Sequence, residues 1–414
     1  MWFSPVQIKE DLTSGSWVTS LAANILRTES VELYIAFKAK CNELEEHKIG
    51  RLSTWHVPSN EFSKYKVIIS NLFNKEIDEN IGDRFSEVVR IVNPDIIQIF
   101  GTESDLGMVI FNTEIPFVFH IQSVFHVYYH KYFSGLTAKD IKKYSLLKLL
   151  IFRMSELNNY KRRIKAVVRE EQYYKKGSYF LGRTDWDRRC ASILGPDARY
   201  FHCDETIREE FFMQKWSKEF NGQEIRLLSI ISGSIYKGLE TIIEATELLE
   251  KVSKYKILWD IIGINKDSES VVICKKKYGK RLSNSINFIG RINSSSEMIK
   301  LMQNSDFFVH PSHIENSPNS ICEAMVLGMP IIATNTGGTS SLLKDNESGI
   351  LIQDGDPWSM AGAILELYKD HEKAIRFSEK ARETAIERHD PNKIVDNLMQ
   401  IYKQIISENK KVAF

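Results

Sequence analysis

The sequence predicts an α/β protein built from two doubly wound domains. Short apolar runs alternate with segments of helical spacing along most of the 414 residues, and this alternation is typical of parallel sheets covered by helices. The pattern restarts at residues 225–231, a buried-strand run that follows the polar linker 221–223. The chain is also longer than one hydrophobic core usually supports. We therefore expect two sheets, one for each half of the chain.

The composition is that of a soluble globular protein, with 43% hydrophobic and 26% charged residues. A formal net charge of +1 argues against nucleic acid as a partner. The five cysteines include no Cys-x-x-Cys pair, so we expect reduced thiols in a cytoplasmic protein, without disulfides or a zinc site. The sequence shows neither a signal peptide nor the run of about 20 apolar residues that spans a bilayer.

Apolar runs predict the individual strands of both halves. In the first half they are residues 1–6, 31–37, 67–70, 96–100, 116–123, 178–182 and 200–202, and in the second half 225–231, 256–262 and 286–291. Residues 205–220 carry an apolar stripe that predicts a helix before the linker. Residues 392–407 predict a long amphipathic helix near the end of the chain.

Residues 306–338 hold the most informative pattern in the chain. An apolar run ends in His-Pro-Ser, a loop carries Glu315, a helix carries Glu323 in its first turns, and Gly-Met-Pro closes that helix. A second apolar run then ends near Gly337 and Gly338, whose backbone amides suit an anion at a helix start. Because ligands bind beyond the carboxyl ends of parallel strands, these groups are expected to meet in one cleft. A carboxylate pair beside a phosphate cradle suits a sugar nucleotide.

This stretch resembles the signature of the large family-four retaining glycosyltransferases, which have the GT-B fold. Seven residues separate the two glutamates of that signature, as they separate Glu315 and Glu323. The resemblance covers most of residues 224–408. It implies that Glu315 faces the donor sugar and that Glu323 holds the ribose hydroxyls of a nucleoside-diphosphate sugar. The alternative is a solvated Glu315 and a Glu323 favoured only by the helix dipole, which leaves the glycines unexplained.

The resemblance implies two facing Rossmann-like domains with a cleft between them. Residues 1–220 would bind the acceptor, residues 221–390 the nucleotide sugar, and residues 391–414 would form a helix that crosses back toward the first domain. The leaving group would be a nucleoside diphosphate whose charge the protein itself stabilises, so neither a metal ion nor another cofactor is expected.

Further donor contacts follow by position in the family pattern. Lys237 matches the phosphate-binding lysine, whereas Ser232 stands where an arginine usually precedes that lysine by five residues. Arg291 is expected either to contact the base or a phosphate of the donor, or to lie on the surface of the protein. The helix that carries Glu323 is expected to begin near Pro318, with Asn319 or Ser317 as its cap. The other positions expected at the donor are Gly15, which also fits an ordinary helix start, and Gly233, Asn319 and Ser320.

Four residues of the first half are expected to contact the acceptor or the sugar. Glu103 follows a strand. It is expected either to bind an acceptor hydroxyl or to cap the start of the next helix. Gln122 occupies the position at which many family members have a histidine, so no general base is assigned there. His120 fits either a sugar contact or a packed core residue. Arg183 lies at the end of another strand and is expected in the cleft.

Residues 138–176 differ in composition from the rest of the chain. They contain twelve lysines and arginines and only four acidic residues, with apolar residues interleaved. Such a segment fits an anionic membrane surface or a phosphorylated acceptor, and it equally fits a solvated helix. Asp185 and Asp187 have the spacing of a metal-binding pair. The start of a helix, with Thr184 or Asp185 as its cap, is the better interpretation of these residues.

Together these observations predict a retaining glycosyltransferase that moves a sugar to a hydroxyl of a glycan or lipid-linked acceptor. Assembly of a surface polysaccharide on the inner face of the membrane is the expected context. Two other interpretations remain open on the same fold: a nucleotide-sugar epimerase and a non-catalytic protein that binds sugar nucleotides.

Overall fold

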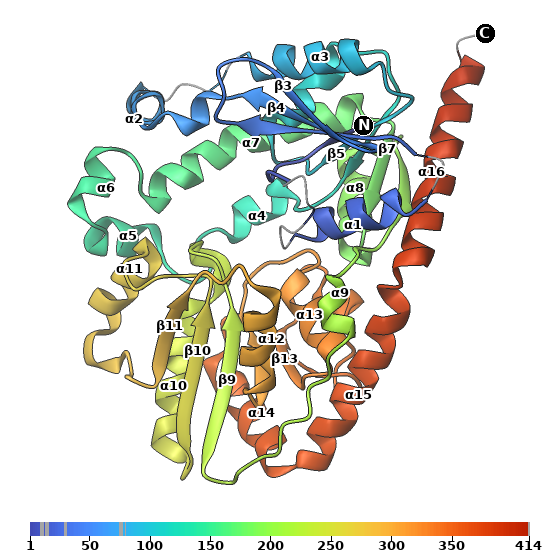
Figure 1. Ribbon diagram of the computed structural model, residues 1–414. Helices are drawn as coiled ribbons and strands as arrows, with labels where there is room; N and C mark the ends of the chain where they lie inside the picture. The colour runs from blue at the N-terminus through green and yellow to red at the C-terminus, as the bar shows by residue number, and fades with distance from the viewer. Residues whose placement is uncertain (9–11, 13–15, 29–30, 74–77, 79, 413–414) are drawn as a thin grey trace.

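The computed structural model describes residues 1–8, 12, 16–28, 31–73, 78 and 80–412. Figure 1 shows two α/β layers stacked one above the other, with the first half of the chain above the second. Each layer contains one sheet of parallel strands, apart from one antiparallel edge strand in the first. The two sheets predicted from the sequence are thus present.

The first sheet follows the order β3-β4-β2-β1-β5-β6-β7-β8. Its strands are β1 (Trp2–Phe3), β2 (Leu33–Ala39), β3 (Glu45–Ile49), β4 (Leu52–Pro58), β5 (Ile97–Phe100), β6 (Phe117–His120), β7 (Tyr179–Gly182) and β8 (Arg199–His202). Its helices are α1 (Trp17–Leu26), α2 (Lys64–Phe73), α3 (Ile81–Val92), α4 (Phe125–Lys131), α5 (Ala138–Tyr144), α6 (Leu147–Ile151), α7 (Glu156–Lys176) and α8 (Asp185–Leu194).

Two predictions about the first half are wrong, and one hairpin was not predicted. Residues 67–70 lie in α2 and not in a strand, because four apolar residues do not distinguish the two. The antiparallel hairpin β3–β4 was missed, since β3 is an exposed edge strand with no apolar face. Of residues 205–220, only α9 (Glu209–Phe212) is helical. Trp216 is instead hydrogen-bonded to the second layer, because its backbone N–H donates to the carbonyl of Leu327 at 2.8 Å.

The second sheet follows the order β11-β10-β9-β12-β13-β14. Its strands are β9 (Glu224–Ile230), β10 (Lys256–Ile262), β11 (Ile286–Gly290), β12 (Phe307–His310), β13 (Ile331–Thr334) and β14 (Ile350–Ile352). Its helices are α10 (Leu239–Val252), α11 (Glu269–Tyr278), α12 (Ser295–Gln303), α13 (Asn319–Leu327), α14 (Pro357–Lys369) and α15 (His371–Arg388).

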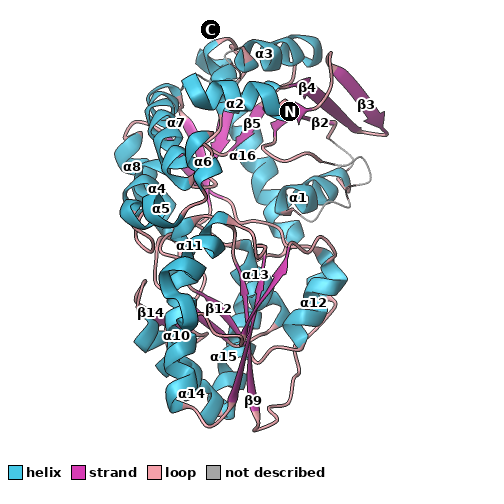
Figure 2. Ribbon diagram, turned by 90° about the vertical axis from the view of Figure 1, so that its left-hand side faces the viewer, coloured by secondary structure: helices cyan, strands magenta, loops and turns pink. Residues whose placement is uncertain are grey.

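Both faces of the second sheet are buried, which explains its continuous apolar strands. Figure 2 shows the sheet edge-on between α10 and α14 on one side and α12 on the other. Successive side chains of β9 enter different cores: Leu227 packs with α10 and Leu228 packs with α13, as the two-residue period of a strand requires.

The last helix, α16 (Pro391–Val412), joins the two layers. Ile394, Leu398 and Ile405 are buried against α1 and the first sheet, at spacings that place them on one helical face. Nε1 of Trp2 donates to the hydroxyl of Tyr402 at 2.9 Å. Among the described residues, no helix has the length and apolar character needed to cross a bilayer.

Candidate active site

A pocket of about 270 Å³ lies where loops of the two sheets meet. Gln122 and Arg183 lie just beyond the ends of β6 and β7, while Ile230 and His310 end β9 and β12. Open parallel sheets bind ligands at such carboxyl ends. The remaining lining residues are Trp17, Lys237, Glu315, Ser317, Pro318, Asn319 and Ser320. We name this space the interdomain pocket.

Lys237 and Glu315 form an ion pair in the interdomain pocket. Lys237 ends a short 3-10 turn after β9, and Glu315 lies in the loop after β12. Nε2 of His310 lies 3.4 Å from Oε1 of Glu315. Burial raises the pKa of Glu315, but Lys237 and His310 outweigh burial and lower it to about 2. Burial also opposes the charge of Lys237, yet Glu315 raises its pKa. Both groups are therefore charged at neutral pH.

Glu323 lies one helical turn beyond Asn319 on α13, next to the residues that line the pocket. Its Oε1 accepts hydrogen bonds from Nη2 and Nε of Arg208, at 2.7 and 3.0 Å. Nη1 of Arg208 donates to Ser295 at 3.2 Å. Burial raises the pKa of Glu323, and Arg208 opposes this rise. Residues four apart share a helical face, so Glu323 and Asn319 face the same side.

Arg208 is a site residue that the sequence did not reveal. It lies in the connection between β8 and β9, which was predicted as an ordinary amphipathic helix. An arginine on such a helix carries no functional signal, because long cationic side chains commonly cover helix surfaces. Only the fold brings its guanidinium to Glu323, 115 positions away in the sequence.

The Gly337-Gly338 turn packs on the loop that carries Glu315. Gly337 has a φ of +51°, and a Cβ atom there would overlap the carbonyl oxygen of Glu315. The backbone N–H of Gly338 donates to that same carbonyl at 3.0 Å. The sequence predicted a phosphate contact for this amide. The structure corrects that prediction, because the turn folds back onto the loop and uses the Gly338 amide to hold Glu315 in place.

The start of α13 also differs from the prediction. Pro318 is the N-cap residue, and no side chain caps the helix. Ser317, one of the two expected caps, instead donates its hydroxyl to Oε1 of Glu205 at 2.6 Å. Asn319 is the first helical residue, so it lies past the cap position and lines the interdomain pocket.

Glu205 is a fully buried carboxylate that links the loop after β12 to the first layer. Burial raises its pKa, but the guanidinium groups of Arg183 and Arg388 hold the pKa well below its usual range. Each guanidinium lies 3.9 Å from Oε2 of Glu205. A buried charge needs such compensation, so this ionic network holds the two layers in register around the pocket.

Thr184 is the N-cap residue of α8, and Asp187 is the third residue of that helix. Thr184 and Asp187 form a capping box, as the capping interpretation predicted. Oδ2 of Asp187 also accepts from Nδ2 of Asn316 at 2.9 Å, and the hydroxyl of Thr184 donates to Oδ1 of Asn316 at 2.7 Å. Asp185 is exposed and pairs with Arg188 at 3.1 Å.

Gln122 and His120 have different surroundings although they lie on one strand end. Gln122 lines the interdomain pocket, and its Oε1 accepts from Nε1 of Trp17 at 3.2 Å. His120 is fully buried against Trp17 and Phe100 and is absent from the pocket lining. Burial lowers its pKa to about 3, which keeps the imidazole neutral. Of the two interpretations of His120, the structure supports the packed core residue.

Four other predicted contacts are not among the residues that line the interdomain pocket, and a fifth falls outside the described residues. Ser232, Gly233 and Arg291 are exposed and do not line the interdomain pocket. Glu103 lines a neighbouring cavity, where burial raises its pKa to about 7. Gly15 falls among the residues that the structure does not describe.

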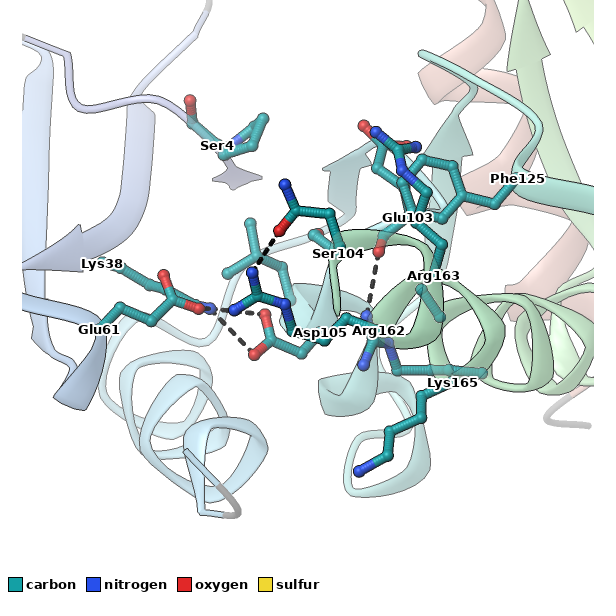
Figure 3. A pocket seen from close by; sticks show the side chains of 15 residues that line it. Ser4, Lys38, Glu61, Glu103, Ser104, Asp105, Phe125, Arg162, Arg163 and Lys165 are labelled. Atoms are coloured by element: carbon teal, nitrogen blue, oxygen red, sulfur yellow. Dashed lines mark hydrogen bonds and ion pairs between the residues drawn. The ribbon is translucent and has the colours of Figure 1, made fainter. Parts of the chain in front are cut away.

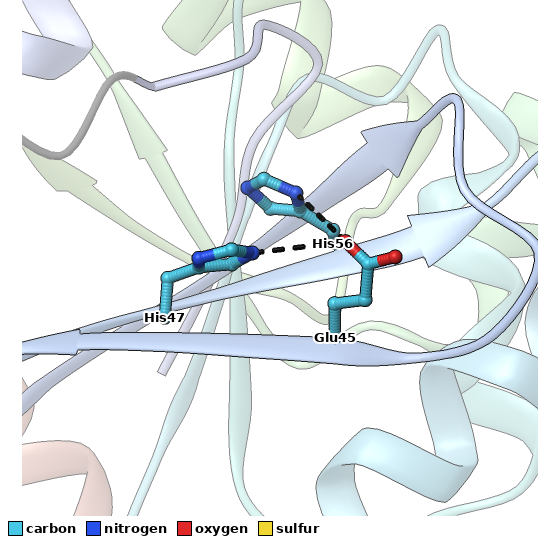
Figure 4. Close-up of side chains that lie close together, drawn as sticks. All are labelled: Glu45, His47 and His56. Atoms are coloured by element: carbon cyan, nitrogen blue, oxygen red, sulfur yellow. Dashed lines mark ion pairs between the residues drawn. The ribbon is translucent and has the colours of Figure 1, made fainter.

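Within the described ranges, two groups of side chains lie close enough to share a metal ion. Figure 4 shows the first, Glu45, His47 and His56, on the hairpin β3–β4. Oε2 of Glu45 lies 3.7 Å from Nε2 of His47 and 3.8 Å from Nδ1 of His56. Glu205, Cys322 and His389 form the second group. None of these residues lines the interdomain pocket.

Comparison with known proteins connects this geometry to a family. Residues 211–384 match the family described as glycosyl transferases group 1. This part of the chain is a group 1 glycosyltransferase domain. It contains Lys237, Glu315 and Glu323, and most of the lining of the interdomain pocket comes from it.

Two curated relatives extend the comparison. An uncharacterized glycosyltransferase of Methanocaldococcus jannaschii is 28% identical over 49% of this chain and 50% of its own length. A putative colanic acid biosynthesis glycosyltransferase, WcaL of Salmonella typhimurium, is 23% identical over 60% of this chain and 63% of its own length. The chain thus spans about half the length of the first of these relatives and somewhat more of the second.

A solved structure matches nearly the whole chain. Anabaena HepE, solved in complex with UDP and glucose, superimposes with a TM-score of 0.63 at 13% identity, covering 97% of this chain and 98% of HepE. This likeness shows a shared fold, the GT-B arrangement of two facing α/β domains. The sequence predicts the same fold.

Proposed function

We propose that this protein is a retaining glycosyltransferase that moves a sugar from a nucleoside-diphosphate sugar to a hydroxyl of a glycan or lipid-linked acceptor. The observation that carries this proposal is the partly buried Lys237–Glu315 ion pair, which lines a pocket formed by loops of both sheets. Glu323 lies on the adjacent helix α13. The membership of residues 211–384 in a glycosyltransferase family gives the pair its chemical context.

In the proposed complex, the donor lies along α13. The carboxylate of Glu323 accepts the ribose hydroxyls, Lys237 donates to the diphosphate, and Glu315 faces the sugar. Charge develops on the departing diphosphate, and fixed charges in a partly dry pocket stabilise it effectively. Arg183 supplies a second cation to the pocket lining, which offsets the serine at position 232. This chain's own cations therefore suffice for the leaving group, and we propose no metal ion in the reaction.

A thermal-shift screen against nucleoside diphosphates and their sugars tests the donor part of the proposal. A ligand that binds only the folded state raises the melting temperature, because it stabilises that state by RT ln(1 + [L]/Kd). We expect one base to dominate the screen, and UDP is the first candidate because HepE was solved with it. Incubation with the donor alone then separates the alternatives, since an epimerase would convert the sugar without an acceptor.

Replacing Glu323 by alanine should weaken donor binding roughly tenfold or more. The variant loses an ionised acceptor for the ribose hydroxyls, and such charge-assisted hydrogen bonds contribute about 1.5–3 kcal/mol. Calorimetric titration with UDP measures the change. Glu210→Ala is the matched control, because Glu210 is exposed and close enough to influence Glu323 electrostatically. Equal affinities in the two variants would remove Glu323 from the donor site.

We further propose that the protein works at the anionic inner face of the cell membrane in polysaccharide assembly. Its relative WcaL carries a name from colanic acid biosynthesis. Figure 1 shows α5 and α6 at an outer edge of the molecule. Exposed apolar residues and cations alternate along α6 and the turn that follows it: Leu147, Lys148, Ile151, Phe152, Arg153 and Met154. Anionic lipid attracts such a mixture of apolar and basic side chains.

Vesicle flotation tests this location. We expect binding to vesicles that contain phosphatidylserine, and its loss in Leu147→Ser/Ile151→Ser, which removes two exposed apolar side chains. The control is Ile193→Ser, because Ile193 is 81% exposed on α8, outside the segment. Flotation that is absent at low salt, or unaffected by the double substitution, would contradict a membrane role for α6.

A further inference from the structure

A second cavity, of about 430 Å³, lies in the first layer beside α7 and the loop after β5. Figure 3 shows its side chains, which are mostly charged. Five are cationic and three are acidic. They are Lys38, Arg162, Arg163, Lys165 and Arg169, with Glu61, Glu103 and Asp105. We name this space the α7 cavity.

The cations of the α7 cavity differ in how they are neutralised. Lys38 forms ion pairs with Glu61 at 2.6 Å and with Asp105 at 2.7 Å, and it thereby accounts for two of the three acids. In the part of the chain that the structure describes, Arg162 and Arg169 have no carboxylate within ion-pair distance. Both lie on α7, seven residues apart, and therefore point to one side of the helix.

The arginines are held in place by neutral groups. Nη1 of Arg162 donates to the side-chain oxygen of Asn71 at 2.8 Å, and Nη2 of Arg169 donates to the carbonyl of Glu103 at 3.0 Å. Nη2 of Arg163 donates to the hydroxyl of Tyr236 at 3.1 Å. These bonds orient the guanidinium groups and leave their charge uncompensated.

Four buried polar atoms in the cavity wall lack a hydrogen-bond partner among the described residues. They are Nη1 of Arg163, Nε of Arg169, Oε2 of Glu103 and Oγ of Ser104. Buried donors and charges without partners are costly, so a ligand that accepts from guanidinium groups would stabilise this arrangement. Burial raises the pKa of Glu103 to about 7, which lessens the opposing negative charge near neutral pH.

The α7 cavity lies next to the interdomain pocket. Arg163 lies over the ring of Tyr236, 5.3 Å from its centroid, and Tyr236 precedes Lys237, which lines the interdomain pocket. Arg163 also lies 4.7 Å from the ring centroid of Phe125, another residue of the cavity wall. Arg163, which lines the α7 cavity, thus contacts the residue that directly precedes Lys237.

We propose that the α7 cavity binds the acceptor and that the acceptor carries an oxyanion, a phosphate ester or a carboxylate, which Arg162, Arg163 and Arg169 recognise. This inference rests on the proposed transfer reaction, in which the donor occupies the neighbouring pocket. Guanidinium groups pair with phosphate and carboxylate oxygens in a forked geometry, so the three arginines select the anionic part of the acceptor. The hydroxyl to be glycosylated then points toward the Lys237–Glu315 pair.

Calorimetric titration of the full chain in phosphate-free buffer, with saturating UDP in the interdomain pocket, tests the proposal. The probes are glucose, glucuronate and glucose 1-phosphate. We expect at least one anionic probe to bind roughly tenfold tighter than glucose or better. The stronger of the two identifies phosphate or carboxylate as the preferred group. Equal binding of all three probes, or no binding, overturns the proposal, and this comparison needs only the unaltered protein.

Arg162→Gln/Arg169→Gln should lower the affinity for the preferred anionic probe by roughly tenfold for each guanidinium removed. The matched control is Arg90→Gln/Lys161→Gln, which removes the same charge from exposed positions outside the cavity. An equal loss in both double variants would indicate a general charge effect and would overturn the proposal. A failure of UDP to bind contradicts the proposed function. The three probes are then compared without UDP, which tests the anion site by itself.

Discussion

Lys237→Ala should lower the rate of sugar transfer by roughly a hundredfold or more. The ammonium group is the cation of the group 1 domain that lines the interdomain pocket, and removing one preorganised donor from a site of developing negative charge commonly costs a factor of 10²–10³. The same substitution leaves the Glu315 carboxylate buried without its main counter-charge. We therefore also expect a loss of roughly 3 kcal/mol in the free energy of unfolding.

Lys218→Ala separates these two effects. Lys218 pairs with Asp306 at 2.5 Å, and the two side chains are 17% and 1% exposed, much as those of Lys237 and Glu315 are. The pair lies outside the interdomain pocket. Lys218→Ala should therefore lose comparable stability in denaturant unfolding while it retains turnover in a donor-consumption assay. If both variants lose turnover equally, Lys237 acts only through the fold.

Gly337→Ala should lower the free energy of unfolding by roughly 3 kcal/mol and abolish most of the transfer activity. A left-handed φ of +51° costs a residue with a Cβ atom about 1–2 kcal/mol. The added Cβ would also overlap the carbonyl of Glu315, and relieving such overpacking costs about 1–3 kcal/mol more. The loop must move to relieve the contact, so Glu315 would leave its position beside Lys237.

Gly222→Ala is the control for the backbone conformation alone. Gly222 has a φ of +69°, and a Cβ atom there would meet no heavy atom within 4 Å. This variant should show the strain of the left-handed conformation and keep full activity. If Gly337→Ala is no less stable and no less active than Gly222→Ala, the turn does not position Glu315.

Much of the fold could be predicted because the second sheet is buried on both faces. The apolar runs at residues 225–231, 256–262 and 286–291 match β9, β10 and β11 within one residue at each end. Prediction was wrong where tertiary contacts or exposure decide the outcome. The edge strand β3 has polar residues on both faces. Within residues 205–220 only the short helix α9 forms, and the backbone N–H of Trp216 donates to Leu327 in the neighbouring layer.

The candidate site was predictable where residues follow strand ends and not where distant segments meet. Lys237, Glu315, Gln122 and Arg183 all lie at or beyond carboxyl ends of strands and converge on one pocket. Arg208 and Glu205 were missed, because their roles depend on partners more than 100 positions away. Local sequence patterns carry no information about such pairs. The Gly338 amide was misassigned because its acceptor is the backbone carbonyl of Glu315, which lies in another loop.

A crystal structure with UDP bound tests the central claim most directly. We expect a ribose within hydrogen-bond distance of Glu323 and a diphosphate within reach of Nζ of Lys237, with Glu315 facing the space that the sugar would fill. Nucleotide bound elsewhere, or bound with its diphosphate away from Lys237 and its ribose away from Glu323, would contradict the account.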